Sequence, residues 1–221
     1  MTVDCLSAMI LQLLNEPVAG KRVLEVGSQD VNGSIRPFVE ALKPREYIGA
    51  DMAPGKGVDV IVNSSGLIGK FGPDSFDLVI STSLLEHVRD WKAAVHNMKG
   101  VCRPGGMILL TTCACGFQYH GHPYDFWRYE LSDLKEIFSD CRIEALEPVY
   151  KNQVLIKAVK PAGFSERGLE QYEMYSLALG GRVQELEEKY FRSWKFKKLI
   201  MRTRIMNAML RIVDFIGSRI I

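Results

Sequence analysis

The segment KRVLEVGSQDVNGS, residues 21–34, constrains the fold more than any other part of the chain. An apolar run ends at Gly27, and the polar residues after it lead into a helical pattern, which predicts a strand, a turn and a helix. Such a turn places backbone N–H groups at a helix start, where they can bind a polar ligand. Only Gly27 and Gly33 are present, with Ser28, Gln29 and Asp30 between them, so the G-x-G-x-x-G spacing of a dinucleotide site is missing.

Apolar runs alternate with helical patterns along the first half of the chain. Strands are predicted at residues 22–27, 46–51, 57–63, 76–82 and 105–112. Helices are predicted in MTVDCLSAMILQLLNE, IRPFVEALK, RDWKAAVHNMKGVC and ELSDLKEIF. Strand, helix and strand at this spacing indicate right-handed crossovers and a parallel sheet covered on both faces. The later runs RIEALEPVY and QVLIKAVK are separated by KN alone, which predicts an antiparallel hairpin.

The chain after Pro161 has no strand pattern and is predicted to be helical. Helices are expected over residues 166–191 and 194–221, with a break at Gly180–Gly181. We therefore predict a mostly parallel α/β domain at residues 1–160 and a helical extension at residues 161–221.

Composition restricts the class of protein further. The chain is 47% hydrophobic and 24% charged, with a formal net charge of +2, values typical of a globular protein without a polyanionic partner. Its five cysteines form no C-x-x-C pair, which favours free thiols in a reducing compartment, and no metal site is predicted. Asp4 stands where a signal peptide needs a positive residue, and no apolar run reaches the roughly 18 residues of a membrane span. We expect a cytoplasmic protein.

The carboxylate of Glu25 distinguishes two ligands for the first turn. It precedes Gly27 by two residues, close to where the pyrophosphate of a dinucleotide would lie, and like charges repel in a partly desolvated site. The same carboxylate suits the ammonium group of S-adenosylmethionine. Asp51 ends the second strand, where an acidic side chain can accept both ribose hydroxyls of either ligand. The pattern favours S-adenosylmethionine, with a nicotinamide-dependent dehydrogenase as the rival.

The chain resembles the class I S-adenosylmethionine-dependent methyltransferases, in particular the small-molecule group called type 11. The matching segments are VLEVGSQDVNG, YIGAD, VIVNSSGLIGKF, PDSFDLVISTSLLEHVRDW and CRPGGMILLTT. They occur in the family's order over residues 21–112, which implies a Rossmann-like sheet. The segment HPYDFWRY is similar to methyltransferases found with glycan-assembly enzymes in bacteria.

The resemblance implies a cofactor site at the carboxyl ends of the first four strands. Its predicted residues are Glu25, Gly27, Ser28, Asp51, Met52, Asn63, Ser81 and Thr82. Asp51 corresponds to the ribose ligand. Asn63 occupies the place of an aspartate that meets the adenine amino group, and its side-chain carbonyl can accept the same hydrogen bond.

Three of the four histidines are predicted to be catalytic. Methyl transfer to a hydroxyl requires a base that removes the proton, and histidine has a pKa near neutrality. His120 and His122 lie in the long loop 113–129, and His87 follows the fourth strand. We prefer His122; its alternative is a turn that stacks on neighbouring aromatic rings. His87 has the alternative of a structural role at a helix start, and His96 is expected to be a surface or packing residue.

The aromatic loop 113–129 is predicted to bind the acceptor. The proposed substrate residues are Tyr119, Tyr124, Trp127 and Arg128. In the alternative, Arg128 pairs with Asp125 and part of the aromatic set belongs to the core or to a lid. The expected reaction is O-methylation of a small-molecule or glycan-like acceptor by S-adenosylmethionine. The alternative function is a partner or regulatory subunit that binds S-adenosylmethionine without transferring the methyl group.

The C-terminal helix combines an apolar stripe with basic residues. The stripe is Leu199, Ile205, Met209, Ile212, Ile216 and Ile220. The basic residues are Lys195, Lys197, Lys198, Arg202, Arg204 and Arg211. We expect the stripe to pack on its own domain or on a second subunit in a homodimer; the alternative is peripheral contact with an anionic membrane. No nucleic acid partner is expected, because the basic residues are confined to this segment and STSLLEH replaces the N-P-P-Y-like tetrapeptide that follows the fourth strand in enzymes acting on extruded bases.

Overall fold

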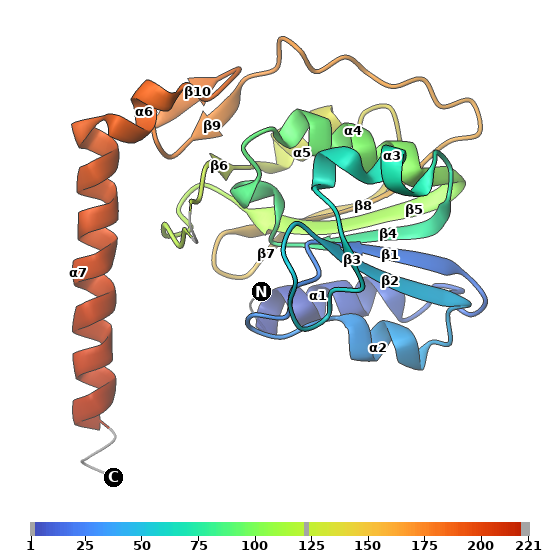
Figure 1. Ribbon diagram of the computed structural model, residues 1–221, viewed down its shortest axis with the longest axis horizontal. Helices are drawn as coiled ribbons and strands as arrows, with labels where there is room; N and C mark the ends of the chain where they lie inside the picture. The colour runs from blue at the N-terminus through green and yellow to red at the C-terminus, as the bar shows by residue number, and fades with distance from the viewer. Residues whose placement is uncertain (1–2, 122–123, 218–221) are drawn as a thin grey trace.

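Seven strands form a central sheet in the order β3-β2-β1-β4-β5-β8-β7 (Figure 1). The computed structural model describes residues 3–121 and 124–217. The strands are β1 (Arg22–Val26), β2 (Glu46–Asp51), β3 (Val60–Ile61), β4 (Phe76–Thr82), β5 (Cys102–Cys113), β7 (Arg142–Val149) and β8 (Gln153–Val159). All neighbouring pairs are parallel except the two that β8 makes with β5 and β7. The predicted α/β class, with a parallel sheet and a terminal antiparallel hairpin, is confirmed.

Helices cover both faces of the sheet (Figure 1). One face carries α1 (Val3–Leu13) and α2 (Arg36–Ala41), and the other carries α3 (Leu67–Phe71), α4 (Trp91–Val101) and α5 (Leu131–Ile137). Each face has its own apolar cluster, and β1 contributes Val23 to one and Leu24 to the other. Because both faces of β1 are buried, its sequence is an apolar run without polar alternation.

The hairpin β7–β8 fixes the start of the loop 113–129. Lys151 and Asn152, in the turn between the strands, have φ values of +62° and +58°. The carbonyl of Asn152 accepts a hydrogen bond from the N–H of Ala114 at 2.8 Å. The long loop therefore leaves β5 from an anchored position at the carboxyl edge of the sheet.

The predicted helix over residues 166–191 is wrong. This segment contains β9 (Met174–Ser176), β10 (Gly181–Val183) and the short helix α6 (Glu188–Arg192). β9 pairs with β10 and with β6 (Trp127–Arg128), which lies inside the long loop. Met174 is fully buried in the main apolar cluster, so tertiary contacts decide the structure where the local pattern favoured a helix. The boundary between residues 160 and 161 stays a prediction.

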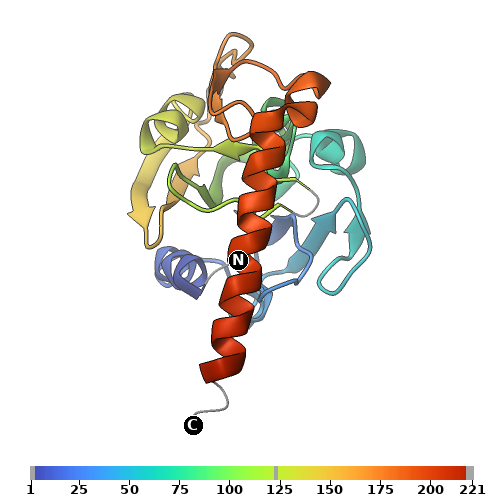
Figure 2. The ribbon, with the colours of Figure 1, turned by 90° about the vertical axis from the view of Figure 1, so that its left-hand side faces the viewer.

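The last helix, α7 (Trp194–Gly217), projects from the body beyond its first turns (Figures 1 and 2). Phe196 is buried against the rings of Tyr119 and Phe191, whereas Ile205 and Met209 are exposed. The exposed part of the predicted stripe therefore does not pack on its own domain. The side chains of Ile212 and Ile216 and the whole of Ile220 lie outside the described residues. Among the helices that the structure describes, none is long and apolar enough to cross a membrane.

Candidate functional site

Gly27 is required where β1 turns toward its loop. Its φ is +79°, and a Cβ at this position would lie 2.9 Å from the side chain of Leu84. Its N–H donates to the carbonyl of Ala50 at 2.8 Å. The turn after β1 is thereby packed between the end of β2 and the segment after β4, at the edge where open α/β sheets bind ligands.

Glu25 lies below this turn and is 2% exposed. The hydroxyl of Tyr47 donates a hydrogen bond to its Oε2 at 2.5 Å. Burial raises the pKa of Glu25 to about 7, although the bond from Tyr47 and the charge of Arg36 oppose the shift. Glu25 is therefore poised between its neutral and charged forms, and a nearby ligand cation would stabilise the charged form.

Asp51 joins two loops at the carboxyl end of β2. Its Oδ2 accepts the N–H of Gln29 at 3.2 Å, and its Oδ1 accepts the N–H of Ala53 at 3.3 Å. Each carboxylate oxygen has a second lone pair, so the oriented side chain can still accept hydroxyl donors. Met52, beside it, is 72% exposed.

The residues that replace the expected glycine fasten the first loop to the loop after β2. Asp30 forms an ion pair with Lys56 at 2.6 Å and accepts the N–H of Gly33 at 2.9 Å. The N–H of Asp30 donates to the carbonyl of Lys56 at 2.8 Å, and the side chain of Gln29 packs beside Gly55. The loop is held by its own side chains rather than by close approach of bare backbone to a ligand.

Of four further predicted cofactor residues, Asn63 and Ser81 have their side chains bound locally. Asn63 Oδ1 accepts both the N–H and the hydroxyl of Ser65, so its two acceptor positions are used within a short 3-10 turn. Ser81 donates to the carbonyl of Val26 at 3.0 Å. The buried hydroxyl of Ser28 has no hydrogen-bond partner among the described residues. Thr82, half-buried, ends β4. Cofactor contacts by these four residues stay predictions.

Ser83 was not singled out from the sequence, although it follows the fourth strand directly. Its φ is +50°, a conformation that is uncommon for a residue other than glycine. Its hydroxyl is buried without a hydrogen-bond partner within the described part of the chain. An uncommon backbone conformation and an unsatisfied hydroxyl at the carboxyl edge mark a second point where a ligand can bind.

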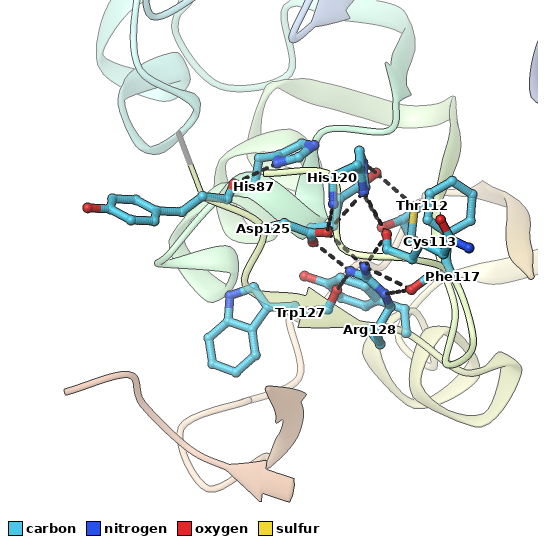
Figure 3. Close-up of polar contacts among 12 residues, drawn as sticks. His87, Thr112, Cys113, Phe117, His120, Asp125, Trp127 and Arg128 are labelled. Atoms are coloured by element: carbon cyan, nitrogen blue, oxygen red, sulfur yellow. Dashed lines mark hydrogen bonds and ion pairs between the residues drawn. The ribbon is translucent and has the colours of Figure 1, made fainter. Parts of the chain in front are cut away.

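Arg128 and Asp125 form a fully buried ion pair that holds the long loop (Figure 3). The guanidinium meets both carboxylate oxygens, at 2.6 and 2.7 Å. Its other donor contacts are with the carbonyls of Phe117, Gln118 and Trp127. The structure therefore shows the pairing of Arg128 with Asp125 that the sequence analysis gave as the alternative to substrate binding. The donors of the Arg128 guanidinium are engaged within the loop.

His120 lies between two buried carboxylates, and its side chain is 36% exposed. Its Nδ1 is 2.9 Å from Asp125 Oδ2, and its Nε2 is 3.8 Å from Glu86 Oε1. Burial alone would lower the pKa of His120, but the hydrogen bond and charge of Asp125, together with the charge of Glu86, raise it. Asp125 thus orients the ring and stabilises its protonated form, as a carboxylate does for a catalytic histidine.

Glu86 lies at the centre of this candidate site, although it was not predicted from the sequence. It is fully buried in the short 3-10 helix η2 (Leu85–His87). Thr112 donates to its Oε2 at 2.7 Å, and Cys113 donates to its Oε1 at 3.2 Å. A ligating atom from each of Glu86, Cys113 and His120 lies within 4.8 Å of the others, a spacing that a small cation could also use. The acidic residue in SLLEHV, directly after a predicted strand, was the available signal.

The remaining predicted catalytic and substrate residues differ in burial and in their contacts. His87 Nδ1 is 2.8 Å from the carbonyl of Tyr124, and its ring meets the ring of His120 edge to face. Trp127 is 1% exposed and donates to the carbonyl of Val88 at 3.0 Å, so it belongs to the core. Tyr124 is 45% exposed, and Tyr119 contacts α7 through the ring of Phe196. His122, the preferred base, lies outside the described residues.

Comparisons with known proteins identify the domain that contains this sheet. The family model described as Methyltransferase domain matches residues 5–164. An uncharacterized methyltransferase from Mycobacterium marinum is 28% identical over 141 residues, covering 58% of this chain and 53% of that protein. The chain thus spans about half the length of the curated relatives it matches.

Solved structures share the fold at lower identity. An S-adenosylmethionine-dependent methyltransferase from Mesorhizobium loti has a TM-score of 0.55 at 15% identity, covering 70% of this chain and 96% of that chain. The 1,6-didemethyltoxoflavin-N1-methyltransferase of Burkholderia thailandensis, with bound 1,6-didemethyltoxoflavin and S-adenosylhomocysteine, has a TM-score of 0.59 at 13% identity. That similarity covers 71% of this chain and 78% of that chain.

Proposed function

The chain belongs to the methyltransferase domain family, and from this premise we propose that it transfers a methyl group from S-adenosylmethionine to a hydroxyl oxygen of a small-molecule or glycan-like acceptor. His120 is the proposed base. The observation that carries this proposal is the His120–Asp125 pair beside Glu86, at the carboxyl edge of β4 and β5.

The residues at the carboxyl ends of β1 and β2 suit the proposed cofactor. When bound, S-adenosylmethionine supplies an electrophilic methyl group on a sulfonium. Glu25 offers a buried carboxylate for the ammonium end, and Asp51 offers oriented oxygens for the ribose hydroxyls. Gly27 gives the turn its positive φ, and the orphan hydroxyls of Ser28 and Ser83 can gain partners from a bound ligand.

His120 has the chemistry of a general base. Because Asp125 accepts from the Nδ1 side, Nε2 is the nitrogen that remains to take a proton in the neutral ring. In the proposed step, Nε2 takes the acceptor's hydroxyl proton while the oxygen–methyl bond forms and the methyl–sulfur bond breaks. Glu86, 3.8 Å from Nε2, stabilises the resulting imidazolium.

The test measures transfer of radiolabelled methyl groups to a panel of hydroxyl acceptors, polyprenyl-linked sugars included. His120→Gln should lower kcat by roughly 100- to 10,000-fold, the usual contribution of a general base. His96→Gln is the matched control, because His96 is a surface histidine of α4 that pairs with Glu166. Equal activity of H120Q and H96Q would exclude His120 as the base. Loss of wild-type activity in a chelator would instead favour a cation at Glu86, Cys113 and His120.

The alternative function is a binding subunit without methyl transfer. Calorimetric binding of S-adenosylhomocysteine, with no turnover on the same panel, would favour it. The glycan-like acceptor rests on the resemblance of HPYDFWRY alone. The cytoplasmic location, the homodimer and the lack of a nucleic acid partner stay predictions.

A further inference from the structure

The outer face of α7 carries exposed apolar side chains. Trp194, Met201, Ile205 and Met209 are 74%, 56%, 48% and 61% exposed. Their spacing of seven, four and four residues places them on one stripe of the helix. Phe196, which is buried against the body, lies on the opposite side of the helical wheel, so the stripe faces away from the body.

Basic side chains accompany this stripe. Lys197 and Arg202 are exposed, and the Lys198 ammonium lies 4.8 Å from the ring centre of Trp194. The sequence of α7 contains six lysine and arginine residues and one acidic residue, Asp214. A tryptophan at one end of an apolar stripe that is flanked by positive charge is typical of helices that lie in a membrane interface.

We propose that α7 binds the surface of an anionic lipid bilayer through the stripe of Trp194, Met201, Ile205 and Met209. Charge complementarity selects this occupant: the basic side chains attract acidic headgroups, whereas they repel the same helix of a second copy. The helix lies on the bilayer and does not span it, because its basic residues interrupt the apolar sequence. The body would then be held at the membrane surface by its last helix.

The test is flotation of the full-length protein with vesicles of phosphatidylcholine alone or mixed with phosphatidylglycerol. Binding is expected only with phosphatidylglycerol and should weaken as salt is raised. Combined substitution of Lys197, Lys198 and Arg202 by Gln should reduce the partition coefficient by about 100-fold, since each base near an anionic surface contributes about one factor of five. The matched control replaces the exposed bases Arg45, Lys70 and Lys135 by Gln and should bind like the wild type.

A second variant tests the apolar stripe. Met201, Ile205 and Met209 replaced together by Gln should lower binding at least about tenfold, because three exposed apolar side chains lose their burial in the interface. The control replaces three exposed apolar residues in α1 and directly after it by Gln, namely Val3, Leu11 and Leu14. Equal binding to both kinds of vesicle, or unchanged binding by both α7 variants, would overturn the proposal. If the wild type formed a dimer without lipid and the variant at Met201, Ile205 and Met209 were monomeric, the stripe would bind a second copy of the chain instead.

Discussion

Glu25 is nearly fully buried beside Tyr47, and its pKa of about 7 lies above the ordinary value of 4.5. A raised carboxyl pKa means that the folded protein binds the proton more tightly than the unfolded chain does. The contribution of the neutral carboxyl to stability is complete below pH 4.5 and is lost as the pH rises toward 7. A ligand that places an ammonium group near Glu25 reverses this preference by favouring the charged form.

Glu25→Gln should remove this pH dependence. In the ligand-free wild type, the free energy of unfolding should fall by about 3 kcal/mol between pH 4.5 and 7 through Glu25, and the neutral amide should abolish that component. Urea unfolding at a series of pH values measures the difference. Binding of S-adenosylhomocysteine should strengthen through the same pH range in the wild type only. If binding to E25Q showed the same pH dependence as binding to the wild type, Glu25 would not interact with the ammonium group of the ligand.

The raised pKa of His120 leads to a prediction for the pH profile of the proposed reaction. Protonated His120 cannot accept a proton, so kcat/KM should fall as the pH drops through its pKa. Glu86→Gln removes a negative charge that raises this pKa, and the acidic limb should move to lower pH. The control is Glu166→Gln, which removes the same charge beside His96 at the surface. If the acidic limb of the kcat/KM profile moved to higher pH in E86Q, Glu86 would not stabilise the protonated form of His120.

At the scale of elements, the buried Asp125–Arg128 pair determines the shape of loop 113–129. Arg128→Met leaves the carboxylate of Asp125 buried with His120 as its remaining ionic partner, a change that costs about 3–5 kcal/mol. The melting temperature should fall by about 10 °C. Arg142→Met, which breaks an ion pair of an arginine that is 66% exposed, should change it by less than about 2 °C. Equal shifts would mean that the buried pair does not stabilise the loop.

The strands of the main sheet were predictable because each is a local apolar run with turn residues beside it. The strands β2 and β4 match their predicted ranges, and the hairpin β7–β8 follows from its short connection. By contrast, β9 and β10 have three residues each, and β9 forms because β6 is available beside it. No local pattern encodes that distant pairing.

The positions of the candidate site residues in the fold were predictable only where they lie at strand ends. The turn at Gly27 and the carboxylates of Glu25 and Asp51 follow from strand ends, which the sequence marks. The contact between His120 and Glu86 joins two loops that are far apart in sequence, so only the folded sheet brings them together. The preference for His122 stays a prediction, because that residue lies outside the described residues.

At the scale of the whole molecule, two groups of residues meet along one edge of the sheet. Glu25, Gly27 and Asp51 lie at the carboxyl ends of β1 and β2, and Glu86 and His120 follow β4 and β5. The topology reverses its direction between β1 and β4, which is where open α/β sheets form a crevice at their carboxyl ends. In the proposed function, the cofactor and the acceptor occupy neighbouring halves of that edge.

Ligand-induced stabilisation of the entire protein distinguishes the two nucleoside ligands. S-adenosylhomocysteine at about 100 times its dissociation constant should add about 2.7 kcal/mol of stability, which corresponds to a rise of about 8 °C in the melting temperature. NAD should produce no comparable rise, because we expect its pyrophosphate to lie close to the carboxylate of Glu25, which would repel it. Differential scanning fluorimetry measures both. Asp51→Ala should reduce the rise at the same ligand concentration, whereas Glu147→Ala, at the exposed hairpin, should retain it. Stabilisation by NAD and none by S-adenosylhomocysteine would contradict the proposed cofactor.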